Sequence, residues 1–119
     1  MARAILKYIN SKGRIMTPED FRQIALDLPN AAESSHMGHP DFRVAGKIFA
    51  TLGYPDSQWG MVKLTSEQQE MLVGAEPAVF TPVKGAWGKR GSTQVLLEAL
   101  DDATAKSALR MAWERIAAK

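Results

Sequence analysis

Helical signatures near the two ends of this chain enclose a long stretch of short strand-like segments, and this order limits the fold more than any other property of the sequence. The strand-like stretch extends from Ala32 to Leu97, where short apolar runs are separated by turn residues. Strands that follow one another closely pair antiparallel, whereas parallel neighbours need a long crossover between them. The order therefore predicts an α+β fold: an antiparallel sheet of about five or six strands with helices packed on one face.

A β-hairpin is predicted over residues 42–52, where side chains alternate around a turn at Ala45-Gly46. Successive residues of a strand point to opposite faces of the sheet. We therefore expect one dry and one wet face. The side chains after and before the turn fall into two sets: Ile48, Ala50 and Leu52 on one face, and Arg43, Lys47, Phe49 and Thr51 on the other.

Further strands are predicted at residues 59–64 and 92–97, with a short extended segment at 79–81. Turn residues at 53–57 separate the first of these strands from the hairpin. Alternation within that strand places three side chains on one face: Trp59, Met61 and Lys63.

Three helices are predicted from their end signals. The first begins at Thr17, whose oxygen can accept a backbone N–H, and ends at Leu28 because Pro29 disfavours helical geometry in the preceding residue. The second begins with a T-x-x-Q capping box at Thr65 and ends at Gly74. The third is capped by Asp101 or Asp102 and turns its apolar side inward: Ala105, Ala108, Leu109, Ala112, Trp113 and Ile116.

The chain is predicted to contain one folded domain. Residues 1–15 precede the first firm helix signal and form an N-terminal extension or a short helix, whereas residues 16–119 form the α+β domain. The opening residues do not resemble a secretory signal, so we expect a cytoplasmic protein. Because no apolar run approaches the roughly 18 residues of a membrane span, we expect no membrane partner.

Several kinds of chemistry are excluded or unsupported. The chain has no cysteine, which excludes disulfides, thiol nucleophiles and zinc–thiolate sites. No set of nucleophile, base and oxyanion donor is recognisable, and the glycine spacing within residues 84–91 differs from phosphate-binding loops, so we expect neither an enzyme nor a cofactor. His36 and His39 suggest a metal site, but the nearby Pro40 opposes a helix. We expect these histidines to support a strand end and turn by hydrogen bonds instead.

Positive charge is concentrated in two segments. Residues 1–15 carry four basic side chains and residues 81–97 carry three, and neither segment contains an acid. The rest of the chain carries eight basic and thirteen acidic residues, which gives the formal net charge of +2. Local positive charge can attract a polyanion by releasing counterions, and a solvated basic loop is the simpler alternative.

The connection over residues 84–91 is the strongest candidate for a binding site. It contains Lys84, Trp87, Lys89 and Arg90. Lysine and arginine pair with phosphates, and tryptophan offers a stacking surface or a wedge. In the alternative interpretation, Trp87 packs inward and anchors the loop, while the neighbouring charges are solvated.

Three motifs that occur in this order resemble the MmcQ/YjbR family. They are GHPDFRV at residues 38–44, GKIFA at residues 46–50 and WGKRG at residues 87–91. The resemblance covers about residues 16–118, and residues 1–15 lie outside it.

The resemblance implies a frataxin-like α+β fold, also described as a double-wing arrangement, for which DNA binding has been proposed. It implies a basic surface that draws on Arg43, Lys47, Trp87, Lys89 and Arg90, to which strand alternation adds Lys63 and the candidate loop adds Lys84. Frataxin itself handles iron on an acidic surface that includes its first helix. The matching helix in this sequence offers too few carboxylates for a cation site, so we expect no metal.

The sequence thus predicts a cytoplasmic, non-enzymatic domain that binds duplex DNA through a basic sheet or wing surface. The alternative is a non-catalytic module that binds a protein or a small molecule in a cleft around His36, His39 and Trp87.

Overall fold

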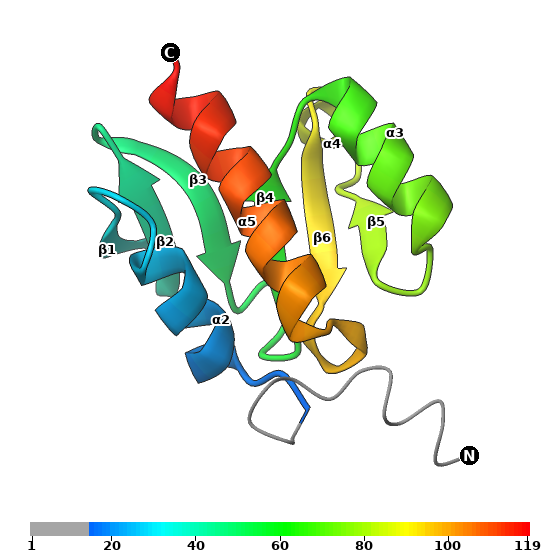
Figure 1. The fold of residues 1–119 in the computed structure, drawn as a ribbon, viewed down its shortest axis with the longest axis horizontal. Helices are drawn as coiled ribbons and strands as arrows, with labels where there is room; N and C mark the ends of the chain where they lie inside the picture. The colour runs from blue at the N-terminus through cyan, green and yellow to red at the C-terminus, as the bar shows by residue number, and fades with distance from the viewer. Residues whose placement is uncertain (1–14) are drawn as a thin grey trace.

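A six-stranded antiparallel sheet forms the centre of the computed structural model, which describes residues 15–119 (Figure 1). The strand order across the sheet is β1-β2-β3-β4-β6-β5. The strands are β1 (Ala32–His36), β2 (His39–Val44), β3 (Lys47–Leu52), β4 (Trp59–Lys63), β5 (Phe80–Pro82) and β6 (Ser92–Leu96). This arrangement confirms the predicted α+β fold. The predicted extension or helix at residues 1–15 lies, apart from Ile15, outside the described residues.

Two helices, α2 and α5, lie in front of the sheet in Figure 1, and α3 lies beside them next to β5. The helices are α2 (Pro18–Leu26), α3 (Ser66–Ala75), α4 (Ala86–Lys89) and α5 (Asp102–Ala117), with a short 3₁₀ turn at Leu97–Ala99. Within residues 15–119, no helix is both long and apolar enough to cross a bilayer.

The helix starts follow the capping signals in the sequence. Thr17 accepts the Asp20 backbone N–H at 3.1 Å and begins α2. The Thr65 hydroxyl oxygen accepts the Gln68 N–H at 3.1 Å and begins α3. The Gln68 side-chain oxygen in turn accepts the Thr65 N–H at 3.0 Å. Asp101 caps α5. The end of α2 differs from the prediction, because the helix stops at Leu26, two residues before the expected position.

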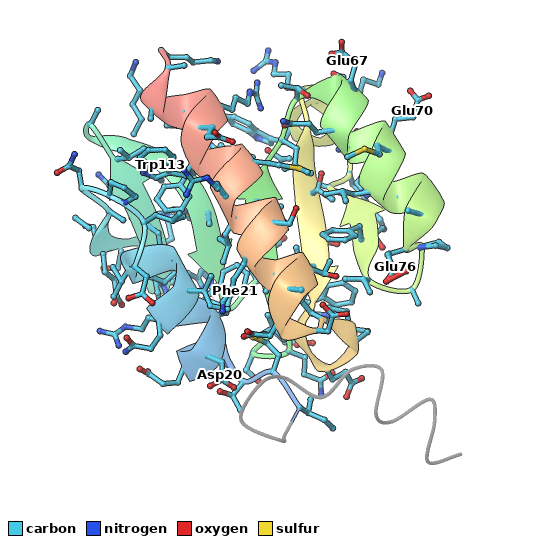
Figure 2. All side chains as sticks on the ribbon, in the orientation of Figure 1. Asp20, Phe21, Glu67, Glu70, Glu76 and Trp113 are labelled. Atoms are coloured by element: carbon cyan, nitrogen blue, oxygen red, sulfur yellow. The ribbon has the colours of Figure 1, made fainter. Side chains whose placement is uncertain are left out.

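The core lies between the helices and one face of the sheet (Figure 2). Phe21 of α2 meets Phe42 of β2 edge to face, with ring centroids 6.4 Å apart. On α5, Trp113 packs against the core and donates its indole N–H to the Pro29 carbonyl at 2.9 Å. The fully buried Leu109 confirms the predicted inward face of this helix.

The predicted division of side chains on β3 is wrong at two positions. Phe49 is fully buried, whereas Ile48 lies on the opposite face of the sheet. A β-bulge shifts the register between Phe42, which pairs with Ala50, and Arg43, which pairs with Ile48. The bulge leaves Phe49 as an extra residue on β3, so simple alternation fails there.

The two hairpins that join β1, β2 and β3 have tight two-residue turns. Both central residues of each turn have positive φ: 51° and 81° at Met37 and Gly38, and 54° and 77° at Ala45 and Gly46. Positive φ at both positions is typical of type I′ turns, whose twist matches that of the strands they join. The predicted turn at Ala45-Gly46 is confirmed.

The connection at residues 84–91 contains the short helix α4 rather than only a loop. Two glycines make its close packing possible. A Cβ on Gly88 would lie 1.6 Å from the Val83 carbonyl oxygen, and a Cβ on Gly91 would lie 1.8 Å from the Leu64 carbonyl oxygen. The Gln69 side-chain amide of α3 also donates to the Gly88 carbonyl at 2.9 Å. Backbone contacts therefore fix the position of this segment.

Replacing Gly91 by alanine is expected to lower the free energy of unfolding by about 3 kcal/mol. The added methyl group overlaps the Leu64 carbonyl, and the φ of +109° at this position strains any L side chain. Urea unfolding followed by circular dichroism measures the change. As the control, Gly74→Ala on α3 meets no atom within 4 Å and should stabilise the protein by about 0.5–1 kcal/mol. Equal stability of Gly91→Ala and the natural chain would contradict the close approach.

Candidate functional site

The face of the sheet that points away from α2 and α5 is called the open face. A row of directly opposed residues crosses it: Asp41 pairs with Thr51, Thr51 with Met61, and Met61 with Gln94. Opposed residues of neighbouring strands project from the same face. The prediction that Trp59, Met61 and Lys63 share a face is confirmed by their alternation with the buried Gly60 and Val62.

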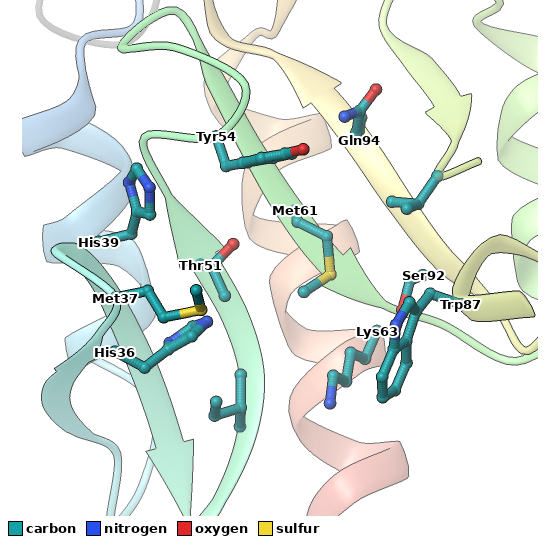
Figure 3. Close-up of a pocket in the computed structure, with 12 residues that line it drawn as sticks. His36, Met37, His39, Thr51, Tyr54, Met61, Lys63, Trp87, Ser92 and Gln94 are labelled. Carbon is teal, nitrogen blue, oxygen red and sulfur yellow. The ribbon is translucent and has the colours of Figure 1, made fainter. Parts of the chain in front are cut away.

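A cavity of about 570 Å³ lies on the open face (Figure 3). Residues of β3, β4 and β6 form its floor, the β1–β2 hairpin and Tyr54 lie on one side, and Trp87 lies on the other. Its lining consists of His36, Met37, His39, Ile48, Thr51, Tyr54, Met61, Lys63, Val83, Trp87, Ser92 and Gln94.

Trp87 lies at the edge of this cavity with 59% of its surface exposed. The alternative in which it packs inward as a loop anchor is therefore wrong. The ammonium group of Lys63 lies 5.7 Å from the centroid of the Trp87 ring, and the guanidinium carbon of Arg90 lies 5.8 Å from it. Both distances allow a cation–π interaction.

Positive side chains from distant parts of the chain lie near one another at one end of the sheet, and two of them, Lys63 and Arg90, flank Trp87. Lys47 reaches the backbone oxygen of Lys119 with its Nζ at 3.5 Å. Arg115 donates to the Leu64 carbonyl, directly after β4. We call this group the basic end of the sheet, and it comprises Lys47, Lys63, Arg90, Arg115 and Lys119.

Burial and neighbouring positive charges both lower the pKa of Lys63. The pKa of Lys63 lies below its ordinary value of 10.5, mainly because burial disfavours the charged amine. The positive charges of Arg115 and Lys119 lower this pKa further. Burial thus removes part of the hydration of the Lys63 amine, and the ion pairs within residues 15–119 do not include it.

Arg43 was predicted to contribute to a basic binding surface, but its guanidinium group is bound to Asp41 within the protein. Its Nε and Nη2 donate to the two oxygens of Asp41 at 2.8 and 3.1 Å, and His36 Nδ1 lies 2.8 Å from Asp41 Oδ2. Asp41 is fully buried, and its pKa is lowered mainly by the hydrogen bonds from Arg43, with a smaller effect from His36. The Arg43 charge is thus neutralised within the protein.

The predicted site residues therefore separate into groups. The structure brings Lys63, Trp87 and Arg90 together, and Lys84 and Lys89 are exposed on the connection that carries Trp87. Lys47 lies beside Lys119, opposite the buried Val44, and therefore projects from the helix-covered face. Sequence reasoning missed Arg115 and Lys119. Arg115 is in the last turn of α5 and Lys119 lies two residues beyond its end, so the only usable signal was their position at the end of the predicted C-terminal helix.

The two histidines form the last cross-strand pair of the β1–β2 hairpin. The hydrogen bond expected of both histidines is found for His36, which bonds to Asp41. His39 meets the Tyr54 ring edge to face at 6.0 Å. Within residues 15–119, no three His, Asp or Glu side chains are grouped so that they could hold a metal ion.

Fold and site together define an α+β protein whose six-stranded sheet has one helix-covered face and one open, partly basic face. The chain belongs to the YjbR family, whose model matches residues 26–115. It is also similar to a solved structure, a Deinococcus radiodurans protein with the DUF419 domain. The two chains are 19% identical and superpose with a TM-score of 0.75 over 88% of this chain and 81% of the other, which supports the shared fold. No curated protein matches the chain.

Asp41→Asn is expected to lower the free energy of unfolding by about 2 kcal/mol at neutral pH, because it removes charge-assisted bonds to a buried carboxylate. The lowered pKa of Asp41 means that its stabilisation is complete above the ordinary value of 3.8 and is lost as the pH falls through the folded value. Urea unfolding at pH 7 and below pH 4 should therefore show a smaller acid loss for Asp41→Asn than for the natural chain. Glu98→Gln, which alters an exposed carboxylate, should retain the natural acid loss. Identical acid dependence of all three proteins would contradict the role of Asp41.

Proposed function

We propose that this YjbR-family chain is a cytoplasmic, non-enzymatic protein that binds duplex DNA through the basic end of its sheet. The observation that supports the proposal is that Lys63 and Arg90 flank the exposed Trp87, next to the positive charges of Arg115 and Lys119. Lys47 adds a further positive charge beside Lys119. Several cations on one surface can neutralise neighbouring phosphates of a duplex.

The charges of the basic end are available to a partner. Within residues 15–119, the ion pairs of basic side chains involve Arg22, His36, Arg43 and Lys106, all outside the basic end. A phosphate can therefore approach without displacing an internal carboxylate. Arg43, by contrast, would have to leave Asp41 before it could contact DNA.

The proposed contacts have different roles. Lys47, Lys89 and Arg90 are exposed and hold phosphates, which positions the protein on the duplex without reading its sequence. Trp87 offers an apolar ring next to these charges and contacts the sugar edge or an unstacked base.

Binding to a fluorescein-labelled duplex of about 20 base pairs should weaken steeply as NaCl is raised. Fluorescence anisotropy measures the affinity at each salt concentration. The double variant Lys89→Ala with Arg90→Ala is expected to bind more weakly and to reduce the salt slope by about two units, close to one for each lost phosphate contact.

A matched double variant controls for the change in net charge. Lys106→Ala with Arg110→Ala removes the same charge from exposed positions on α5 outside the basic end and should leave the salt slope unchanged. Undetectable or salt-insensitive binding to the duplex would overturn the proposal. Equal losses in the two double variants would show that net charge, rather than this surface, controls binding.

A further inference from the structure

The cavity on the open face has the size and lining of a small-molecule site. Its volume of about 570 Å³ falls within the roughly 300–1,000 Å³ common for such sites. Its floor carries Met61 and Ile48, and the rings of Tyr54 and Trp87 stand on opposite sides (Figure 3). Thioether and aromatic side chains make favourable contacts with aromatic ligands.

Exposed apolar side chains gather at this cavity. Within residues 15–119, five large apolar side chains are exposed, and three of them line it: Met37, Tyr54 and Trp87. Met37 is 92% exposed at the tip of the β1–β2 hairpin. Contiguous apolar surface of this kind on a folded protein marks a place where a ligand removes it from water.

The charges at the cavity favour a negatively charged ligand. Lys63 is the cationic lysine in the lining, and none of the twelve lining residues is an aspartate or glutamate. Asp41, which bonds to the lining residue His36, is buried and its charge is neutralised by Arg43. The polar groups of Ser92 and Gln94 lie on the neighbouring strand, β6, and can hydrogen-bond to an anionic oxygen.

We infer that the cavity binds a small aromatic anion, whose acidic group pairs with Lys63 and whose rings lie over Met61 between Tyr54 and Trp87. Lys63 has a partly dry environment, which strengthens its attraction for an anion relative to that of a hydrated surface lysine. The apolar floor supplies the remaining affinity by burying the rings. The Lys63 end therefore fixes the orientation of the ligand in the cavity.

This site does not depend on DNA binding. Lys47, Lys89 and Arg90, which contact phosphates in the proposed DNA complex, are absent from the cavity lining. Lys63 and Trp87 belong to both surfaces. Variants that distinguish DNA binding from small-molecule binding must therefore change residues that belong to only one of the two surfaces.

The test compares an aromatic anion with its neutral analogue, in the absence of DNA. The probes are 8-anilinonaphthalene-1-sulfonate and N-phenyl-1-naphthylamine, which share a ring system and differ in the sulfonate. Fluorescence titration of the natural chain should give saturable one-site binding of both, with the sulfonate bound about tenfold more tightly. Lys63→Met should abolish this preference by weakening the sulfonate about tenfold, the scale of one hydrogen bond to a charged group, and should leave the neutral probe unchanged.

Two further variants test the location of the probe. Met61→Glu places a carboxylate on the cavity floor and should prevent sulfonate binding. Met37→Asn removes an apolar wall side chain at a φ of 51°, which asparagine tolerates, and should weaken both probes about threefold while keeping the fold. Met71→Gln changes an exposed methionine on α3, outside the cavity lining, and should bind both probes as the natural chain does.

Circular dichroism and urea unfolding establish that each variant is folded before it is compared. Non-saturable binding, equal affinity of the natural chain for the two probes, or equal losses in Met37→Asn and Met71→Gln would overturn the inference. Lys89→Ala separates the two surfaces, because it should leave sulfonate binding unchanged whether or not the protein binds DNA.

Discussion

Helix α5 lies against the middle of the sheet with a stripe of small side chains, and this contact organises both faces of the protein. Ala105, Ala108 and Ala112 are buried there, and their small size lets the helix approach β3 and β4 closely. The covered face becomes the dry core, whereas the opposite face keeps its cavity. The same helix carries Arg115, and the residues directly after it carry Lys119, to the basic end. One packing interaction thus determines where the apolar core forms and where positive charge gathers.

Local chemistry made much of the fold predictable. The capping residues Thr17 and Thr65 marked helix starts because their side chains bond to backbone groups only three residues away. The turn at Ala45-Gly46 was also visible, because Gly46 adopts positive φ readily and stands between two strand-like runs. The sequence did not reveal that Ile48 lies on the open face of the sheet and Phe49 in the core. This arrangement depends on a bulge in the pairing of β2 with β3, and alternation along one strand carries no information about its partner's register.

The candidate site was predictable to a smaller extent, since it depends on contacts between distant segments. The pairing of Arg43 with Asp41 was within reach of the sequence, because residues two apart on a strand share a face. The outward position of Trp87 was not, since it requires the close approach of α4 to backbone groups near Val83 and Leu64. The meeting of Lys47 with Lys119 joins residues 72 positions apart in the chain and follows only from the complete fold.

The two edges of the sheet are poor templates for the addition of another strand. Strand β1 is short and fully exposed, and its Glu33 carboxylate is held by Arg22 of α2. At the other edge, β5 contains three residues and ends with Pro82, which has no N–H to offer a neighbouring chain. Short, charged and proline-containing edges discourage edge-to-edge aggregation. The apolar side chains of the open face can therefore stay exposed while the short edge strands resist backbone polymerisation at high concentration.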